Sequence, residues 1–133
     1  METITSRHNP LVAHLRRLAS SGSYRRERGE FLCDSPKLLH EALLHGAELL
    51  TVAATRGMAL PDGIHAGVRL VEVPEDVMQL ISPAKTPQGV VFTCRLPRTE
   101  CPQTLTGARY LALDGVQDPG NVGTILRTLD AFE

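Results

Sequence analysis

A loop near the carboxyl end of the chain carries the residues with the clearest chemical potential. Residues 115–121 read Gly-Val-Gln-Asp-Pro-Gly-Asn, between two apolar segments. A glycine-rich turn between a strand and a helix presents backbone N–H groups and the positive end of the helix dipole, which favour an anionic ligand. The spacing of Gly115 and Gly120 matches half of a P-loop, but Asn121 and Val122 replace its Lys and Ser or Thr. The loop therefore predicts a ligand-binding corner that does not bind nucleotide triphosphates.

A cluster of arginines near the amino end is the second chemical feature. The formal net charge is −1, yet residues 1–30 carry six Arg and three Glu, so this part has a charge of +3 and the rest −4. Arg presents a planar fork of donors that fits phosphate oxygens. Such contacts add affinity for nucleic acid without reading its sequence; the alternative is an ordinary solvated surface. The residues of this basic stretch are Arg16, Arg17, Arg25, Arg26 and Arg28.

The sequence gives little indication of a metal site, a disulfide framework or a membrane-spanning segment. Cys33, Cys94 and Cys101 fit neither a zinc site nor a disulfide framework, so we expect the first two in the core. His40 and His45 lie five positions apart and point to different sides of a helix. No apolar run approaches the roughly 18 residues of a membrane span, and the amino end does not resemble a signal peptide. We expect a cytoplasmic protein without a bound metal.

Apolar patterns predict an α/β fold with a largely parallel sheet, because strands alternate with helices along the chain. Asn9 and Pro10 suit the cap and the first position of the first helix. Residues 20–29 are a loop or a frayed continuation of that helix, and residues 56–67 are irregular. The predicted helices are 10–18, 35–45 and 75–81, and the predicted strands are 31–33, 49–54, 68–73 and 89–94.

The chain is expected to have four parts. Residues 1–30 are a basic helical arm, residues 31–95 an α/β domain, and residues 96–108, which contain two prolines and lack periodicity, a linker. Residues 109–133 hold one strand at 110–114 and one helix after it. One strand and one helix cannot bury their apolar faces alone, so we expect this last part to be the start of an incomplete domain.

The segment from residue 113 to residue 132 resembles the first signature motif of the SpoU/TrmH family of RNA 2′-O-ribose methyltransferases. That motif is a strand ending in Asp, followed by D-P-x-N-x-G-x-I-x-R-T-x-x-A-F and usually Gly, where this chain has Glu133. Segments 4–12, 31–38 and 86–90 also resemble the family, with Asp34 for Glu and Ser35 for Gly in the second of these. The matching motif positions are Asp118, Pro119, Asn121, Gly123, Ile125, Arg127, Thr128, Ala131 and Phe132.

This resemblance implies an N-terminal α/β/α substrate-binding domain, similar to ribosomal and kink-turn-binding proteins, followed by the first βα unit of a knotted SPOUT methyltransferase domain. It implies methyl transfer from S-adenosylmethionine to a ribose 2′-hydroxyl of RNA, and we expect ribosomal RNA as the substrate. It also implies that the intact enzyme is a homodimer. The family's second and third motifs, which hold the cofactor and build the dimer, are absent from these 133 residues. We therefore expect the chain to supply RNA binding and the first motif only, and to be inactive alone.

The resemblance also assigns roles to individual residues. Asn121 becomes an active-site polar contact, although it also suits the N-cap of a helix that starts at Val122. Arg127 is either the base that removes the 2′-hydroxyl proton or a fixed cation that holds phosphate and stabilises the alkoxide. The second role is physically attractive because a guanidinium with a pKa above about 12 rarely releases its proton. The further RNA contacts implied are Arg7, Lys37 and Lys85.

Two other functions remain open. The first is a stand-alone RNA-binding module without catalysis, and the weaker second is a phosphate-binding α/β protein that uses residues 115–121. The sequence has no Trp, two Tyr and three Phe, so platforms for stacking single-stranded RNA are sparse. We therefore expect recognition of folded RNA by its shape and its phosphates.

Overall fold

The computed structural model describes residues 1–97 and 100–132. The chain divides into two compact units, residues 1–98 and 99–133. Arg98 and Thr99, which belong to the predicted linker, and Glu133, at the end of the family-like motif, lie outside the described residues.

Strands and helices alternate through the first unit, as the apolar pattern predicts. Residues 22–28 form a separate short helix, and residues 58–68 contain neither helix nor strand. The short strand at the amino end has no counterpart in the sequence prediction. The elements are β1 (Glu2–Thr3), α1 (Pro10–Ser20), α2 (Gly22–Arg28), β2 (Glu30–Asp34), α3 (Pro36–Leu44), β3 (Leu49–Thr55), β4 (Arg69–Val73), α4 (Glu75–Ile81) and β5 (Val90–Arg95).

The strands form one sheet in the order β1-β4-β3-β5-β2. β4 pairs in parallel with β1 and β3, whereas β5 runs antiparallel to both β3 and β2. The expectation of a largely parallel sheet is therefore wrong for β5, whereas β1, β2, β3 and β4 share one direction. The reason lies in the turn before β5: Thr55 at the end of β3 donates its backbone N–H to Gly89 O, 2.9 Å away. Because β5 begins where β3 ends, the two strands run in opposite directions.

Gly89 has little room for a side chain at this turn. Its φ is +80°, a conformation that favours glycine. A Cβ at this position would lie 2.9 Å from Thr55 Oγ1 and 3.0 Å from Met58 Cε. The glycine thus permits the close approach that starts β5 beside the end of β3.

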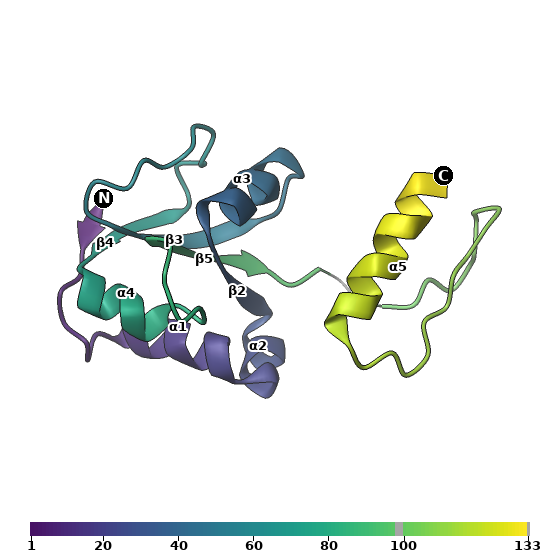
Figure 1. The fold of residues 1–133 in the computed structure, drawn as a ribbon, viewed down its shortest axis with the longest axis horizontal. Helices are drawn as coiled ribbons and strands as arrows, with labels where there is room; N and C mark the ends of the chain where they lie inside the picture. Colours follow the sequence, from purple (N-terminus) through teal and green to yellow (C-terminus); the bar gives the residue numbers. More distant parts are fainter. Residues whose placement is uncertain (98–99, 133) are drawn as a thin grey trace. The chain divides into compact units, whose positions relative to one another are not determined.

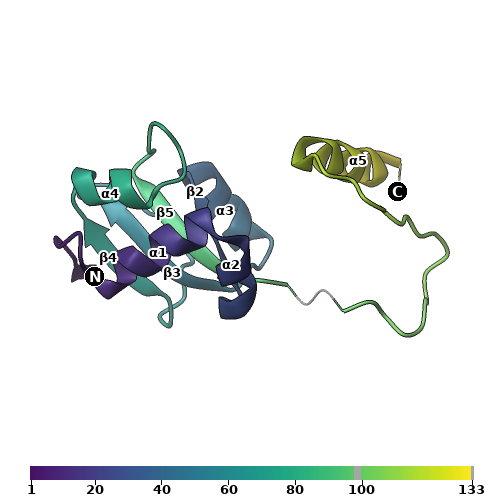
Figure 2. The same ribbon diagram turned by 90° about the horizontal axis from the view of Figure 1, so that it is seen from below.

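Helices cover both faces of the sheet (Figures 1 and 2). On one face, α1 and α4 pack against sheet residues that include Ala53 and Val71. On the other face, Leu39 of α3 packs with Val52 and Phe92. The α/β/α arrangement expected from the resemblance is confirmed.

The first thirty residues are part of this unit and do not form a separate arm. The apolar stripe of α1 explains the difference, because an amphipathic helix is stable only when that face is covered. Leu11, Val12, Leu15 and Leu18 are buried against the sheet.

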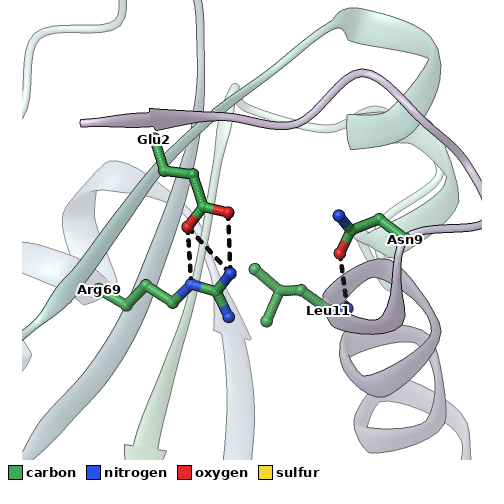
Figure 3. Close-up of polar contacts among 4 residues, drawn as sticks. All are labelled: Glu2, Asn9, Leu11 and Arg69. Carbon is green, nitrogen blue, oxygen red and sulfur yellow. Dashed lines mark hydrogen bonds and ion pairs between the residues drawn. The ribbon is translucent and has the colours of Figure 1, made fainter.

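Two polar contacts anchor the amino end (Figure 3). Asn9 caps α1, as predicted, by accepting a hydrogen bond from Leu11 N at 2.8 Å, and Pro10 follows in the first helical position. Glu2 of β1 accepts two hydrogen bonds from Arg69 of β4, each 2.9 Å long. This forked ion pair ties the edge strand to its neighbour.

The second unit has one described helix, α5 (Pro119–Phe132). The predicted strand at 110–114 is not formed. A strand needs a partner for its backbone hydrogen bonds, and residues 100–118 include no other strand that supplies one. No helix in the described part of the chain is long and apolar enough to cross a membrane.

α5 begins three residues before the predicted start at Val122. Pro119 suits the first helical position, and Asp118 Oδ1 accepts a hydrogen bond from Gly120 N at 3.0 Å. Asn121 is therefore in the first turn of the helix, and its predicted role as the N-cap is wrong.

Candidate nucleic-acid interface

The five arginines of the basic stretch come from two helices that meet at one residue. Arg16 and Arg17 lie in the second half of α1, and the other three lie in α2. Ser21 joins the helices: its N–H bonds to Arg17 O at 2.9 Å, and its hydroxyl caps α2 by accepting from Tyr24 N at 3.2 Å. The tight junction brings Arg17 of α1 and Arg28 of α2 to the same aromatic ring, that of Tyr24.

Tyr24 contacts two arginines of this cluster, one from each helix. The Cζ atoms of Arg17 and Arg28 lie 3.9 and 5.9 Å from the centroid of its ring, within the range of cation–π attraction. Arg25 donates a 2.7 Å hydrogen bond from Nη1 to Leu18 O. Three of the guanidinium groups therefore have defined positions.

A polar chain beneath Tyr24 was not predicted from the sequence. The Tyr24 hydroxyl lies 2.9 Å from Nδ1 of His14, and Nε2 of His14 lies 2.8 Å from the buried carboxylate of Glu30. When Nε2 donates to Glu30, neutral Nδ1 accepts from the hydroxyl. The spacing along the chain gives no local signal for this arrangement, because Glu30 is 16 residues from His14.

The charge of the cluster is not neutralised. Within residues 1–97 and 100–132, none of the five arginines forms an ion pair with a carboxylate. Arg7 differs, because its Nε lies 2.8 Å from Asp76 Oδ2. The cluster can therefore attract an anionic polymer more strongly than Arg7 can.

The two lysines lie in different places. Lys37 is in the first turn of α3, on the sheet face opposite α1. Lys85 is exposed beside α4, where its backbone oxygen accepts a 3.2 Å hydrogen bond from Gln79. The structure thus groups Lys85, and not Lys37, with the face that carries α1.

The family-like segments 31–38 and 86–90 meet at one corner, because β2 pairs with β5 as far as Asp34 and Ser35 then donates its N–H to Val90 O at 3.3 Å. Asp34 Oδ2 accepts a 2.8 Å hydrogen bond from Ser82, which holds the turn before β5. Ser35 caps α3 through its hydroxyl, but its φ is 111°, in a region that glycine favours. Ser35 stands where the family-like motif has glycine, and it keeps a backbone conformation that suits glycine better than serine.

Asn121 and Arg127 are both exposed on α5. Six positions separate them, so they lie about 120° apart around the helix. Arg127 Nη2 donates a 3.3 Å hydrogen bond to Thr124 Oγ1. In this unit the two candidate catalytic side chains do not point to a common centre.

The described part of the second unit does not fit S-adenosylmethionine. No residue of α5 is buried. The groove lined by Arg109, Tyr110, Leu111 and Leu129 offers no carboxylate for the amino acid or ribose part of that cofactor.

Two of the three cysteines, Cys33 and Cys94, pack in the first unit. Burial, with a smaller effect of Cys33, raises the pKa of Cys94 to about 11. Burial and then Asp34 raise the pKa of Cys33. Cys94 is in the core, as predicted, and Cys33 is half-buried against it. Within the described residues, no three His, Cys, Asp or Glu side chains gather in a way that could hold a metal.

Comparison with known proteins gives a consistent picture. The family model described as the MRM3-like substrate binding domain matches residues 9–91. The Bacillus subtilis protein named 23S rRNA (guanosine(2553)-2′-O)-methyltransferase RlmP is 28% identical over 131 residues, which are 98% of this chain and 51% of that protein. A Synechocystis protein named as an uncharacterized tRNA/rRNA methyltransferase is 34% identical, over 97% of this chain and 49% of its own length.

A solved structure shares the fold as well. The AdoMet-bound rRNA methyltransferase from Sinorhizobium meliloti is 32% identical with a TM-score of 0.73, and the match covers 98% of this chain and 51% of that one. This chain thus spans about half the length of the relatives that it matches.

Proposed function

The chain belongs to the family of MRM3-like substrate binding domains, and we propose that its first unit binds RNA for a SpoU/TrmH 2′-O-ribose methyltransferase. The observation that carries the proposal is the arginine cluster on α1 and α2, which lies inside the matched segment and has no carboxylate partner among the described residues. Guanidinium groups without a carboxylate partner, three of them in defined positions, suit the phosphates of a folded RNA.

The contacts divide by strength. Arg16, Arg17, Arg25, Arg26 and Arg28 make the main phosphate contacts. Lys85 extends this surface along α4, and Arg7 contributes less because Asp76 already holds it. Lys37 contacts RNA only where the RNA also reaches the α3 face. These contacts supply affinity, and most of the sequence specificity comes from elsewhere.

For the whole protein we propose methyl transfer from S-adenosylmethionine to a ribose 2′-hydroxyl of ribosomal RNA. The names of the relatives support this reaction class. Asn121 and Arg127 are the proposed active-site residues of this chain. We favour Arg127 as a fixed cation because a guanidinium keeps its proton at neutral pH. The second unit then acts only with the rest of such an enzyme.

A binding measurement on the 133-residue chain tests the first part of the proposal. Fluorescence anisotropy with a labelled ribosomal RNA hairpin is expected to show binding that weakens steeply as salt rises, because each neutralised phosphate releases counterions. No binding at low salt, or binding that is independent of salt, would overturn it.

The second candidate is an RNA-binding module without catalysis. The observation in its favour is that the first unit has its own two-sided core and carries the whole arginine cluster. The intact mass of the protein in its source cells separates the two functions. A mass near 14.5 kDa favours the module, and a mass about twice as large favours the enzyme, since this chain spans about half of its relatives.

A further inference from the structure

We infer that a groove on the first unit, between α1 and the turn that follows α4, holds one unpaired nucleotide of a folded RNA. The inference rests on the proposed RNA-binding function and adds to it a place and a form of RNA. The groove has a volume of about 590 Å³, and its walls include Ala13, Arg16, Arg17, Ser20, Leu80 and Pro83.

The two helices that form the groove lie side by side on one face of the sheet (Figures 1 and 2). Leu15 and Leu18 of α1 are buried against the sheet. The neighbouring side of α1, which faces α4, remains open to solvent at the groove. Leu80 is half-buried at the end of α4, and Pro83 is exposed just beyond. The groove is therefore a surface feature of a well-packed region, and a ligand can enter it without unfolding either helix.

The walls differ in chemistry. One side presents the exposed cations Arg16 and Arg17, and the other presents the apolar side chains of Leu80 and Pro83. A continuous double helix shows phosphates but keeps the faces of its bases stacked inside, so it would leave the apolar wall without a partner. An unpaired nucleotide joins a phosphate to a flat apolar base and can satisfy both walls at once.

Arg17 is held in position for such a ligand. Its guanidinium rests over the Tyr24 ring, and Arg17 is also one of the residues that line the groove. Holding the cation before binding lowers the entropy lost when the phosphate arrives.

Ser20 adds a polar group at the groove. Its hydroxyl donates to Arg16 O at 3.0 Å, which leaves the lone pairs of the oxygen free to accept from a ribose hydroxyl or a base amino group. Because the groove wall has no aromatic ring, we expect little preference among the four bases.

Two RNA hairpins with the same stem test the inference, one with a single bulged uridine and one fully paired. The 133-residue chain is expected to bind the bulged hairpin more tightly. Leu80→Ser is expected to weaken binding of the bulged hairpin by about tenfold, through loss of apolar burial, and to leave the paired hairpin unchanged. The matched control is Leu44→Ser on α3, where the leucine is 68% exposed, and it should change neither affinity.

A photo-crosslinking experiment on the unmodified chain tests the inference independently of whether Leu80→Ser folds. With 4-thiouridine at the bulge, the unmodified chain is expected to give adducts within residues 10–20 or 80–83. Adducts confined to other segments would overturn the inference. Equal affinity for the two hairpins would also overturn the inference and would leave the groove to another occupant, such as a protein segment. If that equal binding still weakened with salt, the proposed RNA-binding function would stand. Failure to bind either hairpin would overturn both the inference and the proposed RNA-binding function.

Discussion

The guanidinium of Arg17 rests over the ring of Tyr24, with 3.9 Å between Cζ and the ring centroid. The two residues come from successive helices, so this contact fixes a cation that would otherwise move freely on the surface of α1. Tyr24 is itself fixed, because its hydroxyl meets His14 and His14 meets the buried Glu30. A chain of four side chains therefore links the interior of the unit to an exposed positive charge.

Two substitutions at Tyr24 separate its ring from its hydroxyl. Tyr24→Ala removes the support under Arg17 and Arg28, and RNA affinity should fall about two- to fivefold, the value of one exposed cation–π contact. Tyr24→Phe keeps the ring, so affinity should hold while the free energy of unfolding drops by about 1 kcal/mol with the lost hydrogen bond. Anisotropy and chemical denaturation measure the two effects. An equal loss of affinity in both variants would contradict the role of the ring.

Arg26→Gln tests whether the cluster contacts phosphates. The slope of log affinity against log salt should become shallower by roughly 0.7 to 0.9, because one fewer counterion is released. Arg56→Gln is the matched control: Arg56 is 91% exposed, belongs to the loop after β3, and lies 3.9 Å from Glu72. The same change of slope in both variants would mean that the positive charge acts without a defined contact.

Ser35 supplies a test of backbone strain. A residue held at such a φ costs about 1–3 kcal/mol, whereas exchanging a serine cap for glycine costs only about a few tenths. Ser35→Gly should therefore raise the free energy of unfolding by about 1 kcal/mol after the entropy cost of glycine. Ser35→Ala loses the cap and keeps the strain, so it should lower stability by about 1 kcal/mol. Denaturation midpoints that move in the same direction for both variants would refute this account.

Cys94 makes stability depend on pH in the alkaline range. Burial raises its pKa from 9.0 to about 11, so the unfolded chain loses this proton at lower pH than the folded chain. The stability that this thiol contributes is complete below about pH 9 and is lost as the pH rises toward 11. The denaturation midpoint of the unmodified chain under reducing conditions should fall over this range. The fall should be smaller in Cys94→Ala and should persist in Cys101→Ala, where the cysteine is exposed.

Arg127→Lys in the full-length protein distinguishes the two roles of Arg127. Lysine releases a proton more easily than arginine but cannot make the planar fork. We expect methylation to be lost in this variant, because the fork is the proposed function. Methylation measured across pH that persists with a shifted optimum would support the base instead.

Most elements of the first unit could be predicted from the sequence, but β1, the separate helix α2 and the pairing of the strands could not. Val90, Val91 and Phe92 are all buried, and a strand covered on both faces has the same apolar run in a parallel or an antiparallel sheet. The direction of β5 depends on the turn at Gly89, which no apolar pattern encodes.

The arginine cluster could also be predicted, but not what supports it. Arg16, Arg17 and Arg25 are visible in the sequence as charge, whereas the contacts of Tyr24 with His14 depend on how α2 turns back at Ser21.

In the second unit, the apolar segment 110–114 resembles a strand, yet local preference cannot replace the partner that a strand requires.

The position of β5 also constrains the order in which the first unit can fold. β2 and β3 are made early, but they never pair with each other because β5 lies between them. During synthesis, β2 must wait for residues 90–95 and β1 must wait for β4, whereas β3 can pair with β4 before β5 is made. Pairings so distant in sequence are slow to form. The sheet is therefore complete only after nearly all of the unit has left the ribosome, when its last strand enters between β3 and the edge strand β2.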